Sequence, residues 1–364
     1  MFNTLEDDEL IEVKNTLIKF ANGEKSALQN AWHNSEWPSE TWNRFAKKDI
    51  IGFTETSNRK GILRIFSLIE GFCRGSGDSS FCTSLIVQFL LCNPIKNKYF
   101  PNYKSNFNDI TCFALTEKQG GSSPFDMTTT LRAKKNQING VKWHITNAPA
   151  CDNILTFGKD KKSNKFFLGI LPSDQKGIRI KQLEAEGMKN SPVGTIHMLN
   201  AQCEDFVVSS KAVKLAIGNA FILERLGVGF AAVGTIEHHL EDLIAYIKNR
   251  KVSDQRIYKH QYIQKRITDI KINLDALKAL LRLTVQFYIE RRDITSLASQ
   301  VKLKAVENVR EFCKNAIFCY GSYGIQKEVG LMRVLNDSMG GSIAGGTEEI
   351  HRNMIFAKMI RQYR

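Results

Sequence analysis

The sequence predicts an α+β fold in which a helical region, an antiparallel β region and a second helical region follow one another. Apolar residues recur at helical spacing up to about residue 110, alternate with polar residues from 112 to about 210, and return to helical spacing after 211. The chain has 364 residues, of which 43% are hydrophobic, so it can bury a large core in more than one domain. We expect three domains, covering residues 1–111, 112–210 and 211–364.

The N-terminal region is expected to consist mainly of helices. Apolar residues repeat at helical spacing over residues 10–21, 62–72 and 80–91. Trp42, Phe45 and Ile50 extend the same pattern between the first two of these segments. A loop is predicted at residues 58–61, where polar residues and a glycine interrupt the pattern.

The central region is expected to form a small antiparallel β-domain. Short segments of alternating polarity lie between clusters of Gly, Asp and Ser, which are typical of turns. The strands expected there cover residues 130–136, 141–146, 153–158, 165–171 and 177–180. Asn139-Gly140 lies between the first two strands, and this dipeptide is a strong signal for the turn of a β-hairpin.

The C-terminal region returns to helical spacing in long segments. Residues 222–247, 264–291 and 294–320 are each long enough for a helix of a bundle. We therefore expect a domain of packed long helices after residue 211.

The chain carries a formal net charge of +14, which favours anionic partners such as acidic proteins and phosphate-bearing small molecules. No segment has the spacing of a nucleic-acid-binding motif. No run reaches the roughly 18 apolar residues of a membrane span. We therefore expect neither nucleic acid nor membrane as a partner. A basic run at residues 248–260 is either a solvated helix end or a surface that contacts phosphate.

The chain has 8 cysteines, and no two of them form a Cys-x-x-Cys pair. Most lie among apolar residues, which favours reduced core thiols over disulfides or metal ligands. The N-terminus is acidic and lacks the pattern of a signal peptide. We expect a cytoplasmic protein without a metal site.

Four short segments carry the functional signal. Residues 112–122 read Cys-Phe-Ala-Leu-Thr-Glu-Lys-Gln-Gly-Gly-Ser, an alternating strand that leads into two glycines and a hydroxyl group. Residues 142–147 begin 20 positions later and read Lys-Trp-His-Ile-Thr-Asn, a strand with a polar end. Residues 223–226 read Leu-Glu-Arg-Leu, and residues 344–349 read Ala-Gly-Gly-Thr-Glu-Glu.

The order and spacing of these segments resemble the acyl-CoA dehydrogenase family, most strongly from residue 112 to residue 364. The resemblance implies an N-terminal helical domain, a central antiparallel β-domain and a C-terminal four-helix bundle. It also implies that the β-domain holds the isoalloxazine ring of FAD against an acyl thioester. No side chain can accept a hydride, so dehydrogenation of a thioester needs such a cofactor.

The resemblance also locates the catalytic base. In many acyl-CoA dehydrogenases the base is the Glu of a Tyr-Glu-Gly-Thr segment, but Gly345 has that position here. The segment around Glu224 resembles the isovaleryl-CoA and long-chain branches, which carry their base on this helix. Arg225 lies 25 positions before Arg250, the interval that the family keeps. We predict that Glu224 removes the α-proton and that the backbone N–H of Gly345 binds the thioester carbonyl.

Other residues match family positions that contact FAD. The flavin-side residues implied by the resemblance are Phe113, Leu115, Thr116, Ser122, His144, Thr146 and Thr347. The remaining cofactor-binding residues that we expect are Arg250, Gln261, Ser322 and Glu349. Three positions depart from the family pattern: His144 replaces the Trp that packs on the flavin, Ser253 replaces a stacking Phe, and Phe318 replaces a Gln. The last two departures affect the segments that hold the adenosine end of FAD.

The resemblance leaves several alternatives open. The thioester is carried either by CoA or by an acyl or aminoacyl carrier protein, and the high positive charge suits an acidic carrier protein. The electron acceptor is either an electron-transfer flavoprotein or oxygen, and the family implies a homodimer or homotetramer. A flavin-dependent monooxygenase of the same fold and a flavin-free binding protein are the alternative functions.

Overall fold

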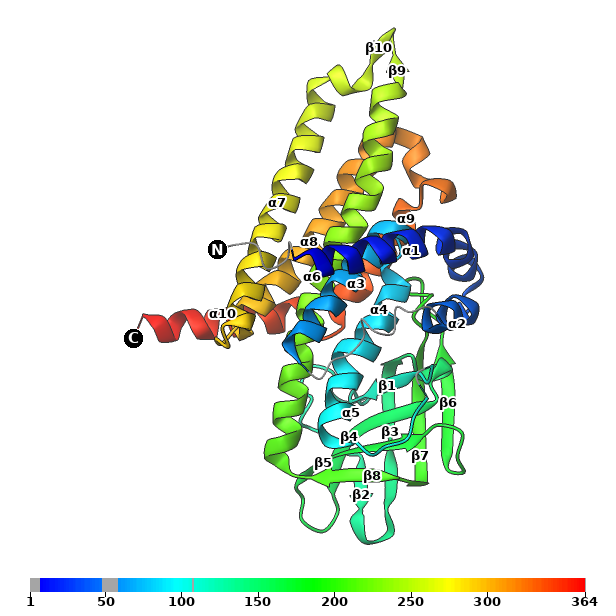
Figure 1. Ribbon diagram of the computed structural model, residues 1–364, viewed down its shortest axis with the longest axis vertical. Helices are drawn as coiled ribbons and strands as arrows, with labels where there is room; N and C mark the ends of the chain where they lie inside the picture. The colour runs from blue at the N-terminus through cyan, green and yellow to red at the C-terminus, as the bar shows by residue number, and fades with distance from the viewer. Residues whose placement is uncertain (1–6, 48–57, 107, 364) are drawn as a thin grey trace. The chain divides into compact units, whose positions relative to one another are not determined.

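The structure is a computed structural model that describes residues 7–47, 58–106 and 108–363 (Figure 1). The chain divides into two compact units. The helical unit comprises Met1–Gln29, Phe66–Cys82 and Arg225–Arg364, and the sheet unit comprises Asn30–Ile65 and Thr83–Glu224. The predicted α+β fold is confirmed, and the division into three domains stays a prediction.

The sheet unit is built on an eight-stranded sheet with the strand order β6-β7-β3-β2-β4-β5-β8, and β1 also pairs with β4 (Figure 1). The strands are β1 (Thr111–Ala114), β2 (Thr130–Arg132), β3 (Gln137–Thr146), β4 (Asn153–Asp160), β5 (Phe166–Pro172), β6 (Ile178–Leu183), β7 (Val193–Gln202) and β8 (Asp205–Val208). β4 is buried along nearly its whole length, as expected for a central strand that is covered on both faces.

The sheet is mixed, so the prediction of an antiparallel β-domain is wrong in this respect. β1 and β2 both run parallel to β4, with Thr111 opposite Asn153 and Thr130 opposite Lys159. Parallel neighbours need a long connection. The chain provides it by forming β2 and β3 between β1 and β4. Alternating polarity indicates which face of a strand is buried and does not report the direction of its neighbour.

The predicted hairpin turn at Asn139-Gly140 is also wrong. β3 runs straight through both residues, and the turn between β2 and β3 is a 3-10 helix at Ala133–Lys135 followed by Asn136 at φ 51°. The pairing of β3 with β7 shifts register between Ile138 and Gly140. A β-carbon at Gly140 would lie 2.4 Å from Thr129 Oγ1, so the glycine permits a close approach of two backbone segments instead of a turn.

Helices pack on the sheet within the same unit. A π-helix at Val87–Cys92 continues into α5 (Asn93–Tyr99), and the first part of α6 (Ser210–Asn249) follows β8. The core between these elements contains the buried residues Leu91, Ile95, Phe100, Leu155, Phe157, Leu168, Ile170, Val213 and Ile217. In α2 (Ser39–Lys47), Trp42 and Phe45 are buried as predicted, whereas Ile50 lies outside the described residues.

The predicted loop at residues 58–61 is instead the beginning of α3 (Arg59–Ser76). Asn58 Oδ1 accepts a hydrogen bond from the backbone N–H of Gly61 at 2.8 Å, which is the arrangement of an N-cap. The side chain that suggested a loop therefore starts the helix.

Long helices form most of the helical unit (Figure 1). They are α1 (Asp8–Asn34), α3, the second part of α6, α7 (Gln261–Ile289), α8 (Thr295–Tyr320), α9 (Leu331–Ile343) and α10 (Glu348–Gln362). α8 contacts α7, α9 and α10. The three long C-terminal helices predicted from the sequence are confirmed. A short hairpin of β9 (Lys251–Val252) and β10 (Gln255–Arg256) lies between α6 and α7.

Two sequence-based expectations concern the environment of the protein. All 8 cysteines are buried and free of disulfides, so the prediction of core thiols is confirmed. By length and composition alone, α6 could cross a membrane, but 72% of its most apolar stretch is buried inside the protein, as in a core helix.

Candidate active site

A buried ion pair joins two of the segments that the sequence singled out. Lys142 on β3 donates from Nζ to Glu117 Oε1 at 2.8 Å, and neither side chain is more than 3% exposed. The same Nζ donates to the carbonyl oxygens of Leu115 and Phe157 at 3.1 and 2.7 Å. The ammonium therefore fixes the end of β1 and the loop after it against β3 and β4.

The carboxylate of Glu117 has a full set of donors. Thr128 and Thr129 each give it a hydroxyl and a backbone N–H hydrogen bond, at distances of 2.5 to 3.0 Å. Burial raises the pKa of this carboxyl, but Lys142 and the threonines outweigh burial and hold the pKa of Glu117 well below its ordinary value. Burial lowers the pKa of Lys142 to about 8, although Glu117 acts in the opposite direction.

Hydroxyl groups remain available at the ends of the same strands. The backbone N–H of Trp143 donates to the carbonyl of Thr116 at 2.9 Å, which holds the loop after β1 beside β3. Thr116 and Thr146 are half-buried, and Ser122 is exposed. Within the described residues, the hydroxyls of these three side chains make no hydrogen bond to the protein. These hydroxyls are therefore available to a ligand, and their contact with FAD stays a prediction.

His144 lies at an irregularity of β3. Its side chain is exposed, and its φ of 54° is in the left-handed region, which few non-glycine residues adopt. The register of β3 against β7 shifts between Lys142 and Ile145 around it. The bulge turns the side chain of His144 out of the regular alternation of the strand. This position departs from the family pattern in sequence and from regular strand geometry in structure.

Aromatic contacts place the first part of α6 against β1. The ring of Phe113 lies 4.9 Å from that of Phe157 and 6.3 Å from that of Phe221 on α6, in an edge contact. Residues three positions apart are neighbours on one face of a helix. Glu224 is therefore on the same face of α6 as Phe221, and it is 6% exposed. Leu115, the other apolar residue predicted here, is buried in the core of the sheet unit.

In the helical unit, Gly345 and Gly346 form a loop between α9 and α10, with φ angles of 65° and 107°. Both values lie in the region that favours glycine. Thr347 is the N-cap residue of α10. Lys302 on α8 donates from Nζ to the carbonyl of Ala344 at 2.6 Å, and only 1% of the lysine is exposed. The loop is therefore anchored from the helical core.

The two glutamates after this loop are poor candidates for a base. Arg310 and Arg352 donate to the carboxylate of Glu348 at 2.6 and 3.0 Å, and these contacts lower its pKa. Glu349 is exposed, and hydrogen bonds from its own backbone N–H and from Thr347 lower its pKa. A general base needs a pKa near the operating pH, and these contacts move the pKa of both glutamates away from it.

The residues predicted to hold the adenosine end of FAD lie on the surface of the helical unit. Arg250, Gln261 and Ser322 are all exposed, at the end of α6, the start of α7 and just after α8. Phe318 is exposed as well, and the guanidinium of Arg266 lies 4.6 Å from its ring centre. Ser253 lies in the turn between β9 and β10 with φ 48°.

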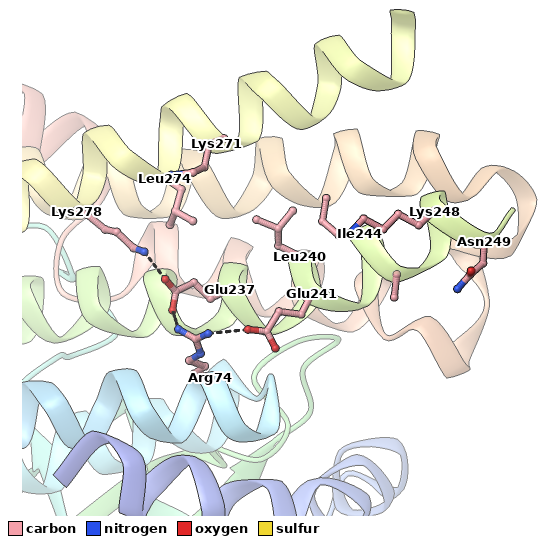
Figure 2. Close-up of a pocket in the computed structure, with 11 residues that line it drawn as sticks. Arg74, Glu237, Leu240, Glu241, Ile244, Lys248, Asn249, Lys271, Leu274 and Lys278 are labelled. Atoms are coloured by element: carbon pink, nitrogen blue, oxygen red, sulfur yellow. Dashed lines mark hydrogen bonds and ion pairs between the residues drawn. The ribbon is translucent and has the colours of Figure 1, made fainter. Parts of the chain in front are cut away.

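A separate cleft of about 680 Å³ opens between α6 and α7 (Figure 2). Among its lining residues, Glu237 pairs with Lys278 and, at 2.6 Å, with Arg74, which also pairs with Glu241 at 2.6 Å. None of the residues predicted for the active site lines this cleft. Four of its charged side chains pair with one another in this way, and we assign the cleft no catalytic role.

Among the described residues, one group of side chains brings metal-ligating atoms together. The ligand atoms of His238, His239 and Asp242 lie within 4.8 Å of one another. A β-carbon at Gly77 would lie 2.9 and 3.0 Å from the two histidine Nε2 atoms, so the Gly77 backbone packs against both rings. Burial lowers the pKa of both histidines. The absence of a metal site stays a prediction.

Two family models match separate stretches of this chain. Residues 112–201 match the acyl-CoA dehydrogenase middle domain, and residues 214–360 match the acyl-CoA dehydrogenase C-terminal domain. These matches cover more than half of the chain. The protein belongs to the acyl-CoA dehydrogenase family.

Known relatives span nearly the whole chain. Caffeyl-CoA reductase-Etf complex subunit CarC of Acetobacterium woodii is 29% identical over 363 residues, covering 92% of this chain and 93% of the relative. The prolyl acyl carrier protein oxidase AnaB has a similar structure, with a TM-score of 0.87, 22% identity, and coverage of 97% of this chain and 99% of AnaB. The FAD complex of PigA has a TM-score of 0.87 and 21% identity, with coverage of 97% and 98%.

Members of this family are FAD-dependent oxidoreductases. The residues of this chain fit a flavin on one side, because Thr116, Ser122 and Thr146 offer hydroxyls that bind nothing else among the described residues. The fit at the adenosine end rests on exposed groups of a single chain, chiefly Arg250 and Gln261.

Proposed function

We propose that the protein is an FAD-dependent dehydrogenase that introduces a double bond between the α and β carbons of an acyl thioester. FAD, when bound, supplies the acceptor for the β-hydrogen, which leaves as hydride. Glu224 takes the α-proton, so two C–H bonds break and one carbon–carbon π bond forms. The backbone N–H of Gly345 donates to the thioester carbonyl and stabilises the negative charge that develops there.

One observation carries this proposal: the carboxylate of Glu224 is buried on α6 beside Phe221, whose ring contacts Phe113. Phe113 is the residue that the family resemblance assigns to the edge of the flavin. A carboxylate that is largely withdrawn from water can act as a general base on a bound substrate.

Within the sheet unit, Thr116, Ser122, His144 and Thr146 hold the flavin ring and the pyrophosphate in this proposal, with Phe113 and Leu115 behind them. Thr347 and Glu349 contact the cofactor from the helical unit. Arg250, Gln261 and Ser322 are exposed in a single chain, as expected for groups that complete the site of a neighbouring subunit. This supports a homodimer or homotetramer. We propose a cytoplasmic location, which suits 8 buried thiols.

Glu224→Gln tests the base. The change removes the proton acceptor and keeps the shape, so flavin reduction by substrate should slow by about 10³-fold or more. The assay is anaerobic bleaching of the bound flavin by a panel of acyl thioesters of CoA and of a carrier protein. Glu307→Gln, an exposed change on α8, is the matched control and should reduce flavin normally. Retained activity in Glu224→Gln would mean that another group is the base.

The same assay separates the alternatives. A monooxygenase of this fold would show no anaerobic bleaching and would consume oxygen only after its flavin had been reduced. A flavin-free binding protein would purify colourless and take up no FAD. Stoichiometric FAD together with anaerobic bleaching supports the dehydrogenase.

The reverse reaction is a second candidate, because CarC of Acetobacterium woodii, 29% identical, is a subunit of a caffeyl-CoA reductase complex. In that direction Glu224 gives its proton to the α-carbon of an enoyl thioester. Mixing the chemically reduced protein with enoyl thioesters tests it. Reoxidation of the flavin by an enoyl thioester that is much faster than bleaching by the saturated thioester would assign the physiological direction to reduction, with an electron-transfer flavoprotein as donor.

A further inference from the structure

The hydrogen bond between Lys302 and the glycine loop has an unusual setting. Lys302 lies on α8 and is 1% exposed, whereas Ala344, whose carbonyl it contacts at 2.6 Å, is exposed. The ammonium therefore reaches the loop from inside the helical unit. A hydrogen bond from a charged donor at this distance is shorter and stronger than a neutral one.

The carbonyl of Ala344 belongs to the peptide group whose N–H is that of Gly345. Resonance couples the two ends of a peptide group. A cation at the oxygen draws electron density toward it, which leaves the N–H more positive and a stronger hydrogen-bond donor. We propose that Lys302 is a positioning residue that strengthens the Gly345 N–H as donor to the thioester carbonyl. The inference rests on the proposed function, in which this N–H stabilises the developing oxyanion.

The surroundings of Lys302 support this role. Arg225 on α6 donates to Ser299 Oγ at 3.5 Å, and His351 Nδ1 lies 3.4 Å from the same hydroxyl. Burial, together with the positive charges of Lys302 and Arg225, lowers the pKa of His351 to about 3. His351 is therefore neutral at physiological pH, and the cationic groups behind the loop act where negative charge develops.

The loop geometry makes this peptide group a fixed donor. Gly345 and Gly346 both have positive φ, and a β-carbon at Gly346 would lie 3.3 Å from His351 Nε2. The loop thus packs on His351 while Lys302 holds the carbonyl of Ala344. A donor held in this way needs no reorganisation when charge forms on the substrate.

The peptide group can be observed directly, since Ala344-Gly345 is the single Ala-Gly step in the sequence. Protein labelled with carbonyl-13C alanine and 15N glycine therefore gives one correlated amide signal, that of Gly345. We would record this signal from the protein as purified with its cofactor and without thioester. Lys302→Gln keeps a neutral donor, Lys302→Met removes the donor, and Lys302→Arg keeps the charge. Lys304→Met is the control, because Lys304 lies on the same helix and bonds Asn273 at 2.9 Å.

We expect the Gly345 amide proton to shift upfield in Lys302→Gln, to remain close to wild type in Lys302→Arg, and to stay unchanged in Lys304→Met. With a thioester that bleaches the flavin, flavin reduction in Lys302→Gln should be about tenfold slower at unchanged KM, because the Gly345 N–H is weakened as a donor and not removed. If Lys302→Met does not fold, the Gln and Arg variants decide.

An unmoved Gly345 amide in Lys302→Gln overturns the inference, and so does an equal shift in Lys304→Met. The amide signal needs no substrate, so the two proposals fail separately. If the Gly345 amide proton shifts as expected in Lys302→Gln but the protein reacts with no thioester, the proposed function is refuted and the polarised peptide group is still supported. Dehydrogenation with an unmoved amide refutes only the role of Lys302.

Discussion

At the scale of single residues, the Glu117–Lys142 pair links the motif after β1 to the motif on β3. Removing one partner of a buried ion pair strands the other charge, which typically costs about 3–5 kcal/mol. We expect Glu117→Gln to lower the free energy of unfolding by about this amount, because Lys142 then loses its anionic partner and keeps only neutral acceptors such as the carbonyls of Leu115 and Phe157. Urea denaturation measures it. Glu184→Gln, an exposed change in the same unit, should shift the free energy by less than about 0.5 kcal/mol.

The pH dependence of the same pair has a definite sign. The pKa of Glu117 is lower in the folded protein than in the unfolded chain, where a glutamate titrates near about 4.3. Its contribution to stability is therefore present above that pH and is lost as pH falls below it. The difference in free energy of unfolding between wild type and Glu117→Gln should therefore become smaller on acidification. A difference that stays constant from pH 7 to pH 3 would contradict the assigned ion pair.

At the scale of elements, α6 packs closely on α3 within the helical unit through a glycine. A β-carbon at Gly234 would lie 2.3 Å from the carbonyl oxygen of Glu70 and 2.9 Å from Cys73 Cβ. Gly234→Ala should destabilise the protein by about 1–3 kcal/mol through overpacking, despite the better helix propensity of alanine. Gly218→Ala is the matched control on the same helix, since nothing lies within 4 Å of that site.

The control should act in the opposite direction. Alanine at an open helical site improves stability by about 0.5–1 kcal/mol, so Gly218→Ala should raise the melting temperature while Gly234→Ala lowers it. Calorimetry of the two variants beside wild type measures both. Equal shifts of the same sign would show that helix propensity alone decides and that α6 and α3 do not meet as closely as described.

Helical periodicity predicted α7 and α8 nearly to their ends, because their buried residues repeat along one face. Prediction from local sequence failed where a residue typical of turns or loops has another role in the folded chain. Gly140 suggested a turn but serves the approach of Thr129, and Asn58 suggested a loop but caps α3. The parallel pairing of β1 and β2 with β4 was invisible, because strand direction depends on the path of the chain.

The predicted site divides in a similar way. Family motifs indicated Thr116, Thr146 and Glu224; the two threonines are half-buried, Glu224 is buried, and their roles stay predictions. The motifs contained Glu117 and Lys142 without revealing that the two pair in the core. A lysine at a buried position of an alternating strand was the available signal. Lys302 was missed altogether, because its partner is a backbone carbonyl 42 positions away.

At the scale of the whole molecule, the net charge of +14 should guide the choice between thioester carriers. Attraction between a cationic protein and an anionic partner raises the association rate and weakens with salt. Exposed cations gather where α6 ends and the β9–β10 hairpin follows, at Lys248, Arg250, Lys251, Arg256 and Lys259. This concentration of charge should attract an acidic carrier protein more than it attracts CoA.

We therefore expect kcat/KM for a carrier-bound acyl group to fall at least about tenfold as salt rises and the Debye length drops from about 30 Å to about 8 Å. The CoA thioester should lose less, and the uncharged pantetheine thioester of the same acyl group should lose almost nothing, which makes it the control for salt effects on folding or chemistry. Stopped-flow flavin reduction at several ionic strengths measures all three. If kcat/KM for the carrier-bound group and for the pantetheine thioester change equally with salt, charge does not select the carrier. The CoA thioester is then the better assignment, because the remaining argument for a carrier protein is fold similarity alone.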